Sequence, residues 1–302
     1  MSEHIGEIFA LLTACCWAVT AMSFEISGKR IGSLAVNFIR LVIGFGFLCV
    51  FSYLYRGMIL PFDATAHNWL WLSISGLIGF SFGDLMLFRA FVVIGSRVSM
   101  LIMSLVPVFA AISGWLLMRE HLSLMDLFGM TLTIVGIAIV ITQKESSDSH
   151  FKQPIRRRKY PVSGILFAVA GALGQAIGLV FSKYGMGDYD AYSATQIRAI
   201  AGIAGFAILY IPLRAWPKVI KGVKNRSAMK IVILGSFFGP FLGVSFSLLS
   251  VRYTATGIAS TIMSIVPILI IPPAVVFFHE KVTLKEVLGA FVSVAGVSIL
   301  FI

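Results

Sequence analysis

Long apolar stretches alternate with short polar ones along the whole chain. Ten stretches are mostly apolar, at residues 7–28, 33–55, 68–91, 95–118, 124–143, 161–184, 190–213, 228–250, 255–278 and 283–302. Each is close to the roughly 20 residues that a helix needs to cross a bilayer. A polar stretch, KESSDSHFKQPIRRRKY at 144–160, separates the fifth from the sixth. The pattern predicts ten transmembrane helices in two groups of five, at 1–143 and 161–302, joined by a basic linker at 144–160.

The two groups are copies of each other. Residues 96–142 align with 256–302 without a gap and share ten identities in 47 positions, among them the phrases IMSLVPV and IMSIVPI. Earlier in the chain an offset of 158 places Arg40 on Arg198 and Gly44 on Gly202. Because each copy has an odd number of spans, the second copy must enter the membrane with the opposite orientation. Inverted repeats of this kind surround a central cavity near the membrane midplane and permit alternating access.

Composition supports a membrane protein. Hydrophobic residues make up 58% of the chain and charged residues 12%, and the mean hydropathy is +0.95. A soluble domain has roughly 45–50% apolar and about 25% charged residues. We therefore expect a multi-pass protein of the cell membrane, which is the inner membrane if the cell is Gram-negative. Most of the basic residues behind the net charge of +11 lie in short stretches between the apolar runs, which indicates contact with membrane lipids and argues against nucleic acid as a partner.

Basic residues also predict the orientation of the chain. Seventeen lie in or beside loops that follow odd-numbered spans: Lys29, Arg30, Arg97, Lys144, Lys152, Arg156, Arg157, Arg158, Lys159, Arg214, Lys218, Lys221, Lys224, Arg226, Lys230, Lys281 and Lys285. Four follow even-numbered spans: Arg56, Arg119, Lys183 and Arg252. Because basic loops stay in the cytoplasm, this bias predicts that both termini are outside and the linker is inside.

Two further features recur in both copies. Pro107 and Pro267 fall in the middle of the fourth and ninth spans, where proline kinks a helix or supplies a hinge. After Glu120 and Glu280 come the pairs Ser123 with Asp126 and Thr283 with Glu286, which fit a capping box at the start of the next helix. Glycines seven residues apart (129 and 136, 289 and 296) share a helix face and predict close packing.

The repeated spacing carries a resemblance. In both copies a proline is followed after thirteen residues by a glutamate, after nine more by a glycine and after seven more by another glycine. With an arginine in the second span of each copy, this resembles the EamA-type branch of the drug/metabolite transporter superfamily. The resemblance implies ten helices around a central cavity, and transport of small polar metabolites or amphipathic compounds, often outward. Asp84 and Arg89 depart from the repeat, since Val244 and Leu249 stand opposite them.

Charged residues inside spans are candidates for the site, because each costs roughly 2.5–3.5 kcal/mol on insertion. We expect one cavity between the halves to be bordered by Trp17, Glu25, Arg40, Asp84, Gln175, Gln196 and Arg198. Arg40 would meet an anionic group of the substrate, and Asp84 or Glu25 would contact an ammonium group or carry a coupling proton. The alternative for Asp84 is a structural ion pair with Arg40 or Arg97.

The leading interpretation is a secondary transporter, in the direction of export, for small polar metabolites such as amino acids. One alternative is export of larger amphipathic or drug-like compounds, which the 25 phenylalanines would suit. A non-transporting lipid-interaction or scaffold protein is the alternative from another class.

An enzyme is not expected, since the histidines lie at span ends or in loops and no HExxH motif occurs. No cofactor, catalytic residue or metal ligand is predicted, and no GxxxxGK[ST] loop marks a nucleotide-driven pump. The sequence leaves the substrate, the coupling ion and the oligomeric state open.

Overall fold

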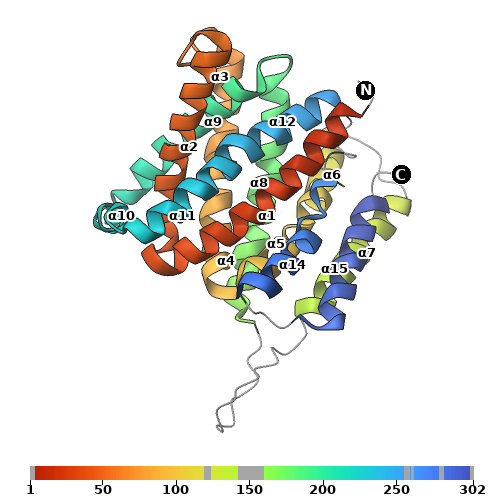
Figure 1. Cartoon of the computed structure of the whole chain (residues 1–302). Coiled ribbons are helices and arrows are strands. Elements are labelled where there is room, and N and C mark those ends of the chain that lie inside the picture. The colour runs from red at the N-terminus through yellow and green to blue at the C-terminus, as the bar shows by residue number, and fades with distance from the viewer. Residues whose placement is uncertain are drawn as a thin grey trace.

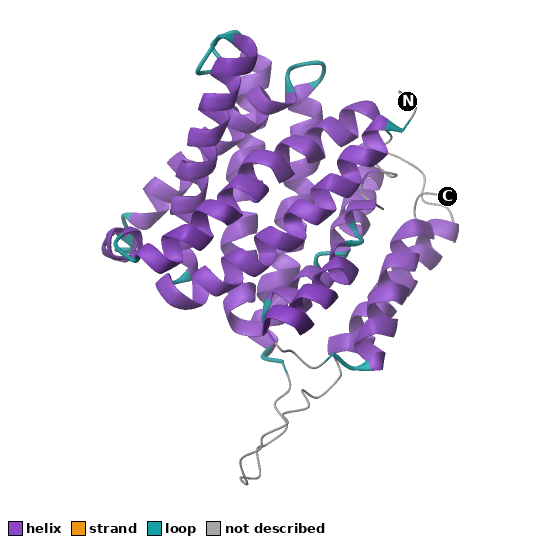
Figure 2. Ribbon diagram, viewed as in Figure 1, coloured by secondary structure: helices purple, strands orange, loops and turns teal. Residues whose placement is uncertain are grey.

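The computed structural model describes residues 4–118, 124–141, 160–254, 259, 262–278 and 282–299, and these form helices joined by short loops (Figures 1 and 2). In the first half the helices are α1 (Ile5–Ile31), α2 (Ser33–Arg56), α3 (Ala66–Gly76), η1 (Leu77–Gly83), α4 (Asp84–Ile94), α5 (Ser96–Ile102), α6 (Leu105–Met118) and α7 (Leu124–Ile141). In the second half they are α8 (Val162–Met186), α9 (Ala191–Tyr210), α10 (Trp216–Val223), α11 (Arg226–Ser236), η2 (Phe237–Gly243), α12 (Val244–Tyr253), α14 (Val266–Phe278) and α15 (Leu284–Ile299). The expected linker, apart from Tyr160, and Glu120, Ser123 and Glu280 lie outside the described residues.

Six helices are long and apolar enough to cross a membrane, and three shorter apolar helices accompany them in the described ranges. The six are 5–31, 33–56, 66–94, 162–186, 191–210 and 226–253, and the shorter ones lie within 96–110, 127–140 and 266–276. These positions match nine of the ten apolar stretches of the sequence. Large apolar side chains such as Leu124, Phe62 and Leu54 are at least 77% exposed, as expected for a surface that faces lipid.

Helix ends follow local sequence signals. Thr65 accepts a hydrogen bond from the Asn68 backbone while the Asn68 side chain accepts from Thr65, which closes a capping box at the start of α3. The predicted box at α15 is confirmed, with a distance of 2.9 Å from Thr283 N to the Glu286 carboxylate and 3.3 Å from Glu286 N to the Thr283 hydroxyl. Gly57 ends α2 in the left-handed conformation that favours glycine, with φ of 71°.

A π-helical turn interrupts the third span of each half at the same place. η1 and η2 are seven residues each and lie 160 positions apart. At their ends the backbone N–H groups of Asp84 and Val244 reach back five residues to the carbonyls of Gly79 and Gly239. The sequence analysis did not predict these turns. Short π-helical turns inside α-helices occur frequently at functional sites.

The helices at the predicted fourth and ninth spans are broken rather than smoothly kinked. Helix α5 stops at Ile102 and α6 begins at Leu105, two residues before Pro107. A proline cannot donate to the carbonyl four residues earlier, and the Met103 carbonyl accepts from Val106 N instead, at 2.9 Å. On either side of Pro267, Ile265 N and Ile268 N likewise donate three residues back, to the carbonyls of Ile262 and Ile265.

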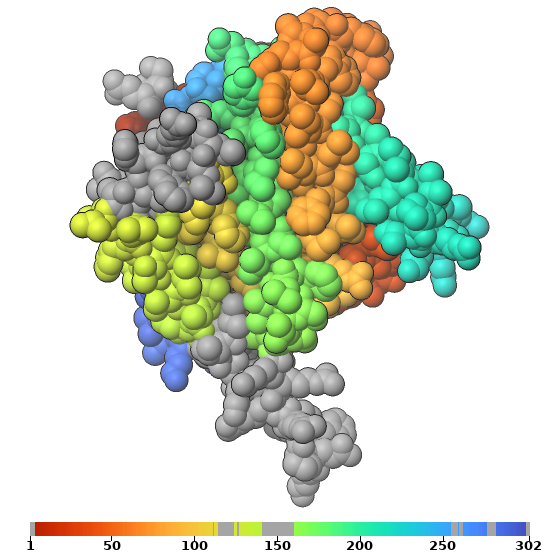
Figure 3. Space-filling model, turned by 180° about the vertical axis from the view of Figure 1, so that it is seen from behind, coloured from red at the N-terminus to blue at the C-terminus, as the bar shows by residue number. Residues whose placement is uncertain are grey.

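Glycines bring helices of the two halves into backbone contact. A Cβ on Gly178 would lie 2.9 Å from the Gly79 Cα, and one on Gly174 would lie 2.8 Å from the Gly83 Cα, so α8 packs directly on η1. Viewed from behind, α8 in green runs beside residues 66–94 in orange (Figure 3). In the reciprocal contact, α1 packs on α11, η2 and α12, where a Cβ on Gly235 would lie 2.5 Å from the Phe24 ring.

Helices α7 and α15 form a tight pair at the edge of the molecule (Figure 1). A Cβ on Gly136 would lie 2.4 Å from Ser293 N, and one on Gly296 would lie 2.4 Å from Thr133 N. The predicted close packing of the paired glycines is therefore confirmed for these two, and the surface they meet belongs to the other half.

Candidate functional site

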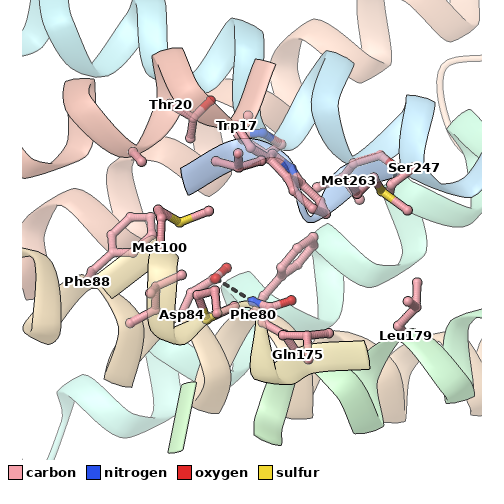
Figure 4. Close-up of a pocket in the computed structure, with 18 of the residues that line it drawn as sticks. Trp17, Thr20, Phe80, Asp84, Phe88, Met100, Gln175, Leu179, Ser247 and Met263 are labelled. Carbon is pink, nitrogen blue, oxygen red and sulfur yellow. Dashed lines mark hydrogen bonds between the residues drawn. The ribbon is translucent and has the colours of Figure 1, made fainter. Parts of the chain in front are cut away.

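A cavity of about 150 Å³ lies between the two halves. Its walls come from α1, α2, η1, α4, α5 and α6 of the first half and from α8, α9, η2, α12 and α14 of the second. In Figure 4, Trp17 and Thr20 lie on one side of this cavity and Asp84 and Gln175 on the other. Buried polar side chains on facing membrane helices require partners or a ligand, so the contacts of each one decide what the cavity can do.

Asp84 is the centre of a buried polar network. Its carboxylate accepts a hydrogen bond from the guanidinium of Arg40 on one oxygen and from the Gln175 amide on the other, at 2.6 Å. Asn37 supports the ion pair at both members. Its side-chain oxygen accepts a hydrogen bond from Arg40 Nε, and its side-chain nitrogen donates one to the Asp84 backbone carbonyl. Of the two partners that the sequence offered for Asp84, the structure selects Arg40. Arg97 instead reaches Glu286, at 3.5 Å.

Arg198, the repeat counterpart of Arg40, has different surroundings. It lines the same cavity and is 4% exposed. Its guanidinium lies 4.8 Å from the centre of the Phe80 ring, a cation–π contact. Within the described part of the chain, its Nε has no hydrogen-bond partner. The sequence analysis assigned anion binding to Arg40. In the structure the Asp84 carboxylate already pairs with the Arg40 guanidinium. The Arg198 guanidinium has fewer polar contacts.

Trp17 and Gln175, which correspond in the repeat, both meet a π-helical turn. A Cβ on Gly243 of η2 would lie 3.0 Å from the Trp17 ring. On the other side, Gln175 donates to the Gly79 carbonyl of η1 at 3.2 Å. Both glycines therefore let a cavity side chain approach the helix backbone. Glycines four apart at corresponding positions of the two copies could have indicated these turns in the sequence.

The repeated proline phrase also lines the cavity. Ser104 and Pro107 contribute from the first half, and Ser264 and Pro267 from the second. The Ser104 hydroxyl, like that of Thr20, has no hydrogen-bond partner among the described residues. The sequence analysis identified the phrase by its repetition but assigned no role to its serines. Their place three residues before a proline, at the helix break, was the available signal.

Most of the remaining wall is apolar and aromatic. Members of this set come from both halves and include Phe80, Leu87, Phe88, Phe91, Met100, Met103, Leu179, Val244 and Met263. Phe88 also supports the polar network, since its ring centre lies 4.5 Å from the Arg40 guanidinium. The cavity therefore offers a small charged region beside a larger apolar one, as is common for small-molecule sites.

Two residues expected at the cavity lie elsewhere. Glu25 accepts from Lys29 and from the Ser96 backbone N–H at 2.6 Å, because the first N–H groups of α5 lack intrahelical partners. Gln196 donates to the Ile59 carbonyl at 2.9 Å. It precedes Arg198 by two residues, which is about 200° around a helix, so the two face opposite directions.

A second polar cluster joins the halves at loops away from the cavity. Arg56 bonds Asp63 and Ser193, and the Tyr189 hydroxyl donates to Asp63 at 2.9 Å. Burial raises the pKa of the Asp63 carboxyl, but the hydrogen bonds from Arg56 and Tyr189 lower it, and the net result is a pKa below its ordinary value. No group of three or more potential metal ligands occurs within the described ranges.

Comparison with known proteins decides the family. The sequence pattern of the EamA-like transporter family matches residues 4–142 and again 162–302. The chain belongs to the EamA-like transporter family. Its two EamA domains correspond to the two copies seen in the sequence. EamA-like proteins are membrane transporters and not enzymes.

Two proteins named as transporters are distant relatives of this chain. The chain is similar to "Uncharacterized transporter YoaV" of Bacillus subtilis, with 26% identity over 137 residues that cover 45% of this chain and 46% of that protein. It is also similar to an "Uncharacterized transporter" of Methanothermobacter thermautotrophicus, with 24% identity over 67% of this chain and 55% of that protein. The matched regions thus span about half the length of these relatives.

A solved crystal structure has the same fold. Its TM-score to this structure is 0.58 at 18% identity, over 99% of this chain and 95% of the other. At this identity the likeness concerns the fold alone.

Proposed function

We propose that this EamA-like protein is a secondary transporter that exports small metabolites bearing a carboxylate, such as amino acids, by alternating access. The observation that carries this proposal is the cavity between the halves, in which the buried guanidinium of Arg198 lies beside the Arg40–Asp84 pair. Arginine binds carboxylates with two parallel hydrogen bonds. A site of this kind recognises the acid group that small metabolites share.

The proposed architecture is ten transmembrane helices in two inverted repeats. It is supported by π-helical turns at matching positions and by the reciprocal packing of α1 and α8 on the third span of the other half. In this architecture the cavity lies near the midplane and one bundle rocks against the other. The turns η1 and η2 and the breaks at Ser104 and Ser264 are the positions that could bend.

Coupling to protons has one candidate in the cavity. Asp84 holds Arg40 and Gln175 together while it is ionised, and protonation would weaken both contacts. Glu25, the other carboxylate considered for this role, caps α5 instead. A substrate driven by its own gradient is the alternative to proton coupling.

Efflux from proteoliposomes tests the proposal. The full chain would be reconstituted in vesicles loaded with a mixture of labelled amino acids and organic acids, and loss of each compound would be followed. Arg198→Gln should reduce efflux of the transported compound by tenfold or more, since a hydrogen bond to a charged group contributes about 1.5–3 kcal/mol. Arg89→Gln is the matched control, because Arg89 is exposed and contacts Phe167 outside the cavity. An equal loss of efflux in Arg198→Gln and Arg89→Gln would show that Arg198 has no specific role in substrate binding.

A second candidate substrate class is larger amphipathic compounds. The aromatic and methionine side chains of the cavity wall favour it, because flexible apolar surfaces accept varied shapes. The same vesicles loaded with lipophilic cationic dyes separate the two classes. A dye that leaves faster than every acid would support this candidate. Vesicles that retain every compound would support a lipid-interaction or scaffold protein that does not transport.

We also propose that both termini are outside the cell and that the 144–160 linker is cytoplasmic. The amphipathic helix α10, with Lys218 and Lys221 on its exposed face, would then lie at the cytoplasmic membrane surface. Anionic headgroups of that leaflet attract basic residues.

A further inference from the structure

The cavity contains more positive than negative charge. Within the described part of the chain, its charged residues are Arg40, Arg198 and Asp84. Arginine side chains carry a positive charge in proteins. The lining therefore carries one surplus positive charge while Asp84 is ionised, and two when it is protonated.

Asp84 is already engaged by two partners. One of its oxygens accepts from Arg40 and the other from Gln175. Arg198 receives only longer-range attraction from this carboxylate, and its Nε has no hydrogen-bond partner in the described ranges. A buried charge without a partner is unfavourable, and an opposite charge brought by a ligand removes that cost.

We propose that the cavity selects organic acids with a net negative charge and an apolar body, and discriminates against zwitterions. This inference rests on the transport function proposed above and narrows its substrate class, from carboxylates in general to acids that are not zwitterionic amino acids. A carboxylate would pair with Arg198 and neutralise the surplus charge. An ammonium group would find no free carboxylate, since Asp84 is engaged, and would lie near two guanidinium groups that repel it.

The rest of the wall fits the apolar body of such an acid. Trp17, Phe88, Met100 and Met263 line the cavity from different helices, and their side chains can surround an aromatic or branched group. The hydroxyls of Thr20 and Ser104, which lack partners among the described residues, can donate to further oxygens of the ligand.

Three probes with one carbon skeleton test the inference. The purified full chain would be titrated with 3-phenylpropanoate, L-phenylalanine and 3-phenylpropanamide at pH 7, in a buffer without carboxylate or phosphate, and binding would be followed by the shift in Tm. We expect the acid to bind at least about tenfold more tightly than the amide, as a charge-assisted hydrogen bond predicts, and more tightly than the zwitterion. Arg198→Gln should abolish this preference, Arg198→Lys should retain part of it, and Arg89→Gln should leave it unchanged.

The outcomes separate the two proposals. Tighter binding of phenylalanine than of 3-phenylpropanoate would overturn this inference and leave the transport of amino acids standing. Equal binding of acid and amide would overturn it as well. Failure of all three probes, and of the compounds in the efflux assay, would remove both proposals. If Arg198→Gln does not fold, the probe series on the native chain and on Arg198→Lys still decides.

Discussion

Asp84 and Arg40 form an ion pair in a place where each alone would be costly. Arg40 is 3% exposed and Asp84 is 5% exposed, and aromatic rings of Phe24, Phe80 and Phe88 surround the guanidinium. Removal of one partner of a buried pair leaves the other charge without compensation. The pair therefore fixes how α2 and α4 meet, whatever else it does.

The ion pair predicts strong coupling between its two members. Asp84→Asn should destabilise the protein by roughly 3–5 kcal/mol, because Arg40 stays buried without its carboxylate. Arg40→Gln combined with Asp84→Asn should cost less than the sum of the single changes, by roughly 1–3 kcal/mol. Tm in detergent measures both, with the exposed loop change Asp188→Asn as control. A strictly additive double variant would show that the two residues are not coupled. An unchanged Tm together with a flattened pH profile of transport would instead make Asp84 a proton carrier.

Asp63 predicts a pH dependence with a definite sign. Its pKa is below the ordinary value of about 3.8, so its contribution to stability is complete above that value and is lost as the pH falls through the folded pKa. The difference in Tm between the native chain and Asp63→Asn should therefore be constant from pH 7 down to about pH 5 and shrink steadily as the pH falls below about 4. The effect should be small, since the Asp63 side chain is 37% exposed and is screened by solvent. A difference that grows on acidification would show that Asp63 is not stabilised by its ionised form.

At the scale of helices, small residues decide which surfaces meet. The α7–α15 contact is close enough that the Thr133 hydroxyl lies 3.4 Å from the Ser293 carbonyl across the two helices. In lipid, helices associate through close packing and hydrogen bonds of this kind rather than through burial of apolar area. Short side chains are therefore required at the crossing.

Gly136→Ala tests this contact with a single methyl group. The added Cβ would lie 2.4 Å from Ser293 N and 2.7 Å from the Gly289 carbonyl, both backbone atoms, so the helices must separate. We expect a loss of roughly 1–3 kcal/mol, seen as a lower Tm. Gly46→Ala is the matched control in α2, where nothing lies within 4 Å of the new Cβ. It should be neutral or slightly stabilising. A Tm for Gly136→Ala equal to that of the control would show that the pair tolerates separation.

At the scale of the whole molecule, the distribution of charge predicts the orientation in the membrane. Single cysteines at Ser149 and Asp188 test it, in a background without Cys15, Cys16 and Cys49. A membrane-impermeant thiol reagent applied to intact cells should label Asp188→Cys, and should label Ser149→Cys only after permeabilisation. The two positions lie in a basic linker and in an acidic loop, which the charge rule places on opposite sides of the membrane. The reversed labelling pattern would place the termini inside and falsify the charge-based assignment.

The apolar spans, the duplication and the glycine spacing could be read from the sequence, because each depends on residue type and distance along the chain. The pairing of Asp84 with a buried arginine was among the predicted alternatives for the same reason, since a charge inside a span needs a partner. The π-helical turns were missed although paired glycines marked their positions, because what these glycines meet in the other half, such as Gly178 beside Gly79, follows only from tertiary packing.

Only the tertiary structure decided which buried polar residues reach the cavity. The rotation of each helix about its axis is set by its contacts, and it turns Gln196 toward Ile59 while Arg198 lines the cavity. Glu25 is equally buried, but it accepts a hydrogen bond from the Ser96 N–H at the start of α5, which has no partner within its own helix. The sequence by itself determined that two arginines occupy equivalent positions in the two copies. That one of them pairs with a carboxylate and the other does not follows from the single Asp84 carboxylate, which breaks the symmetry of the repeat.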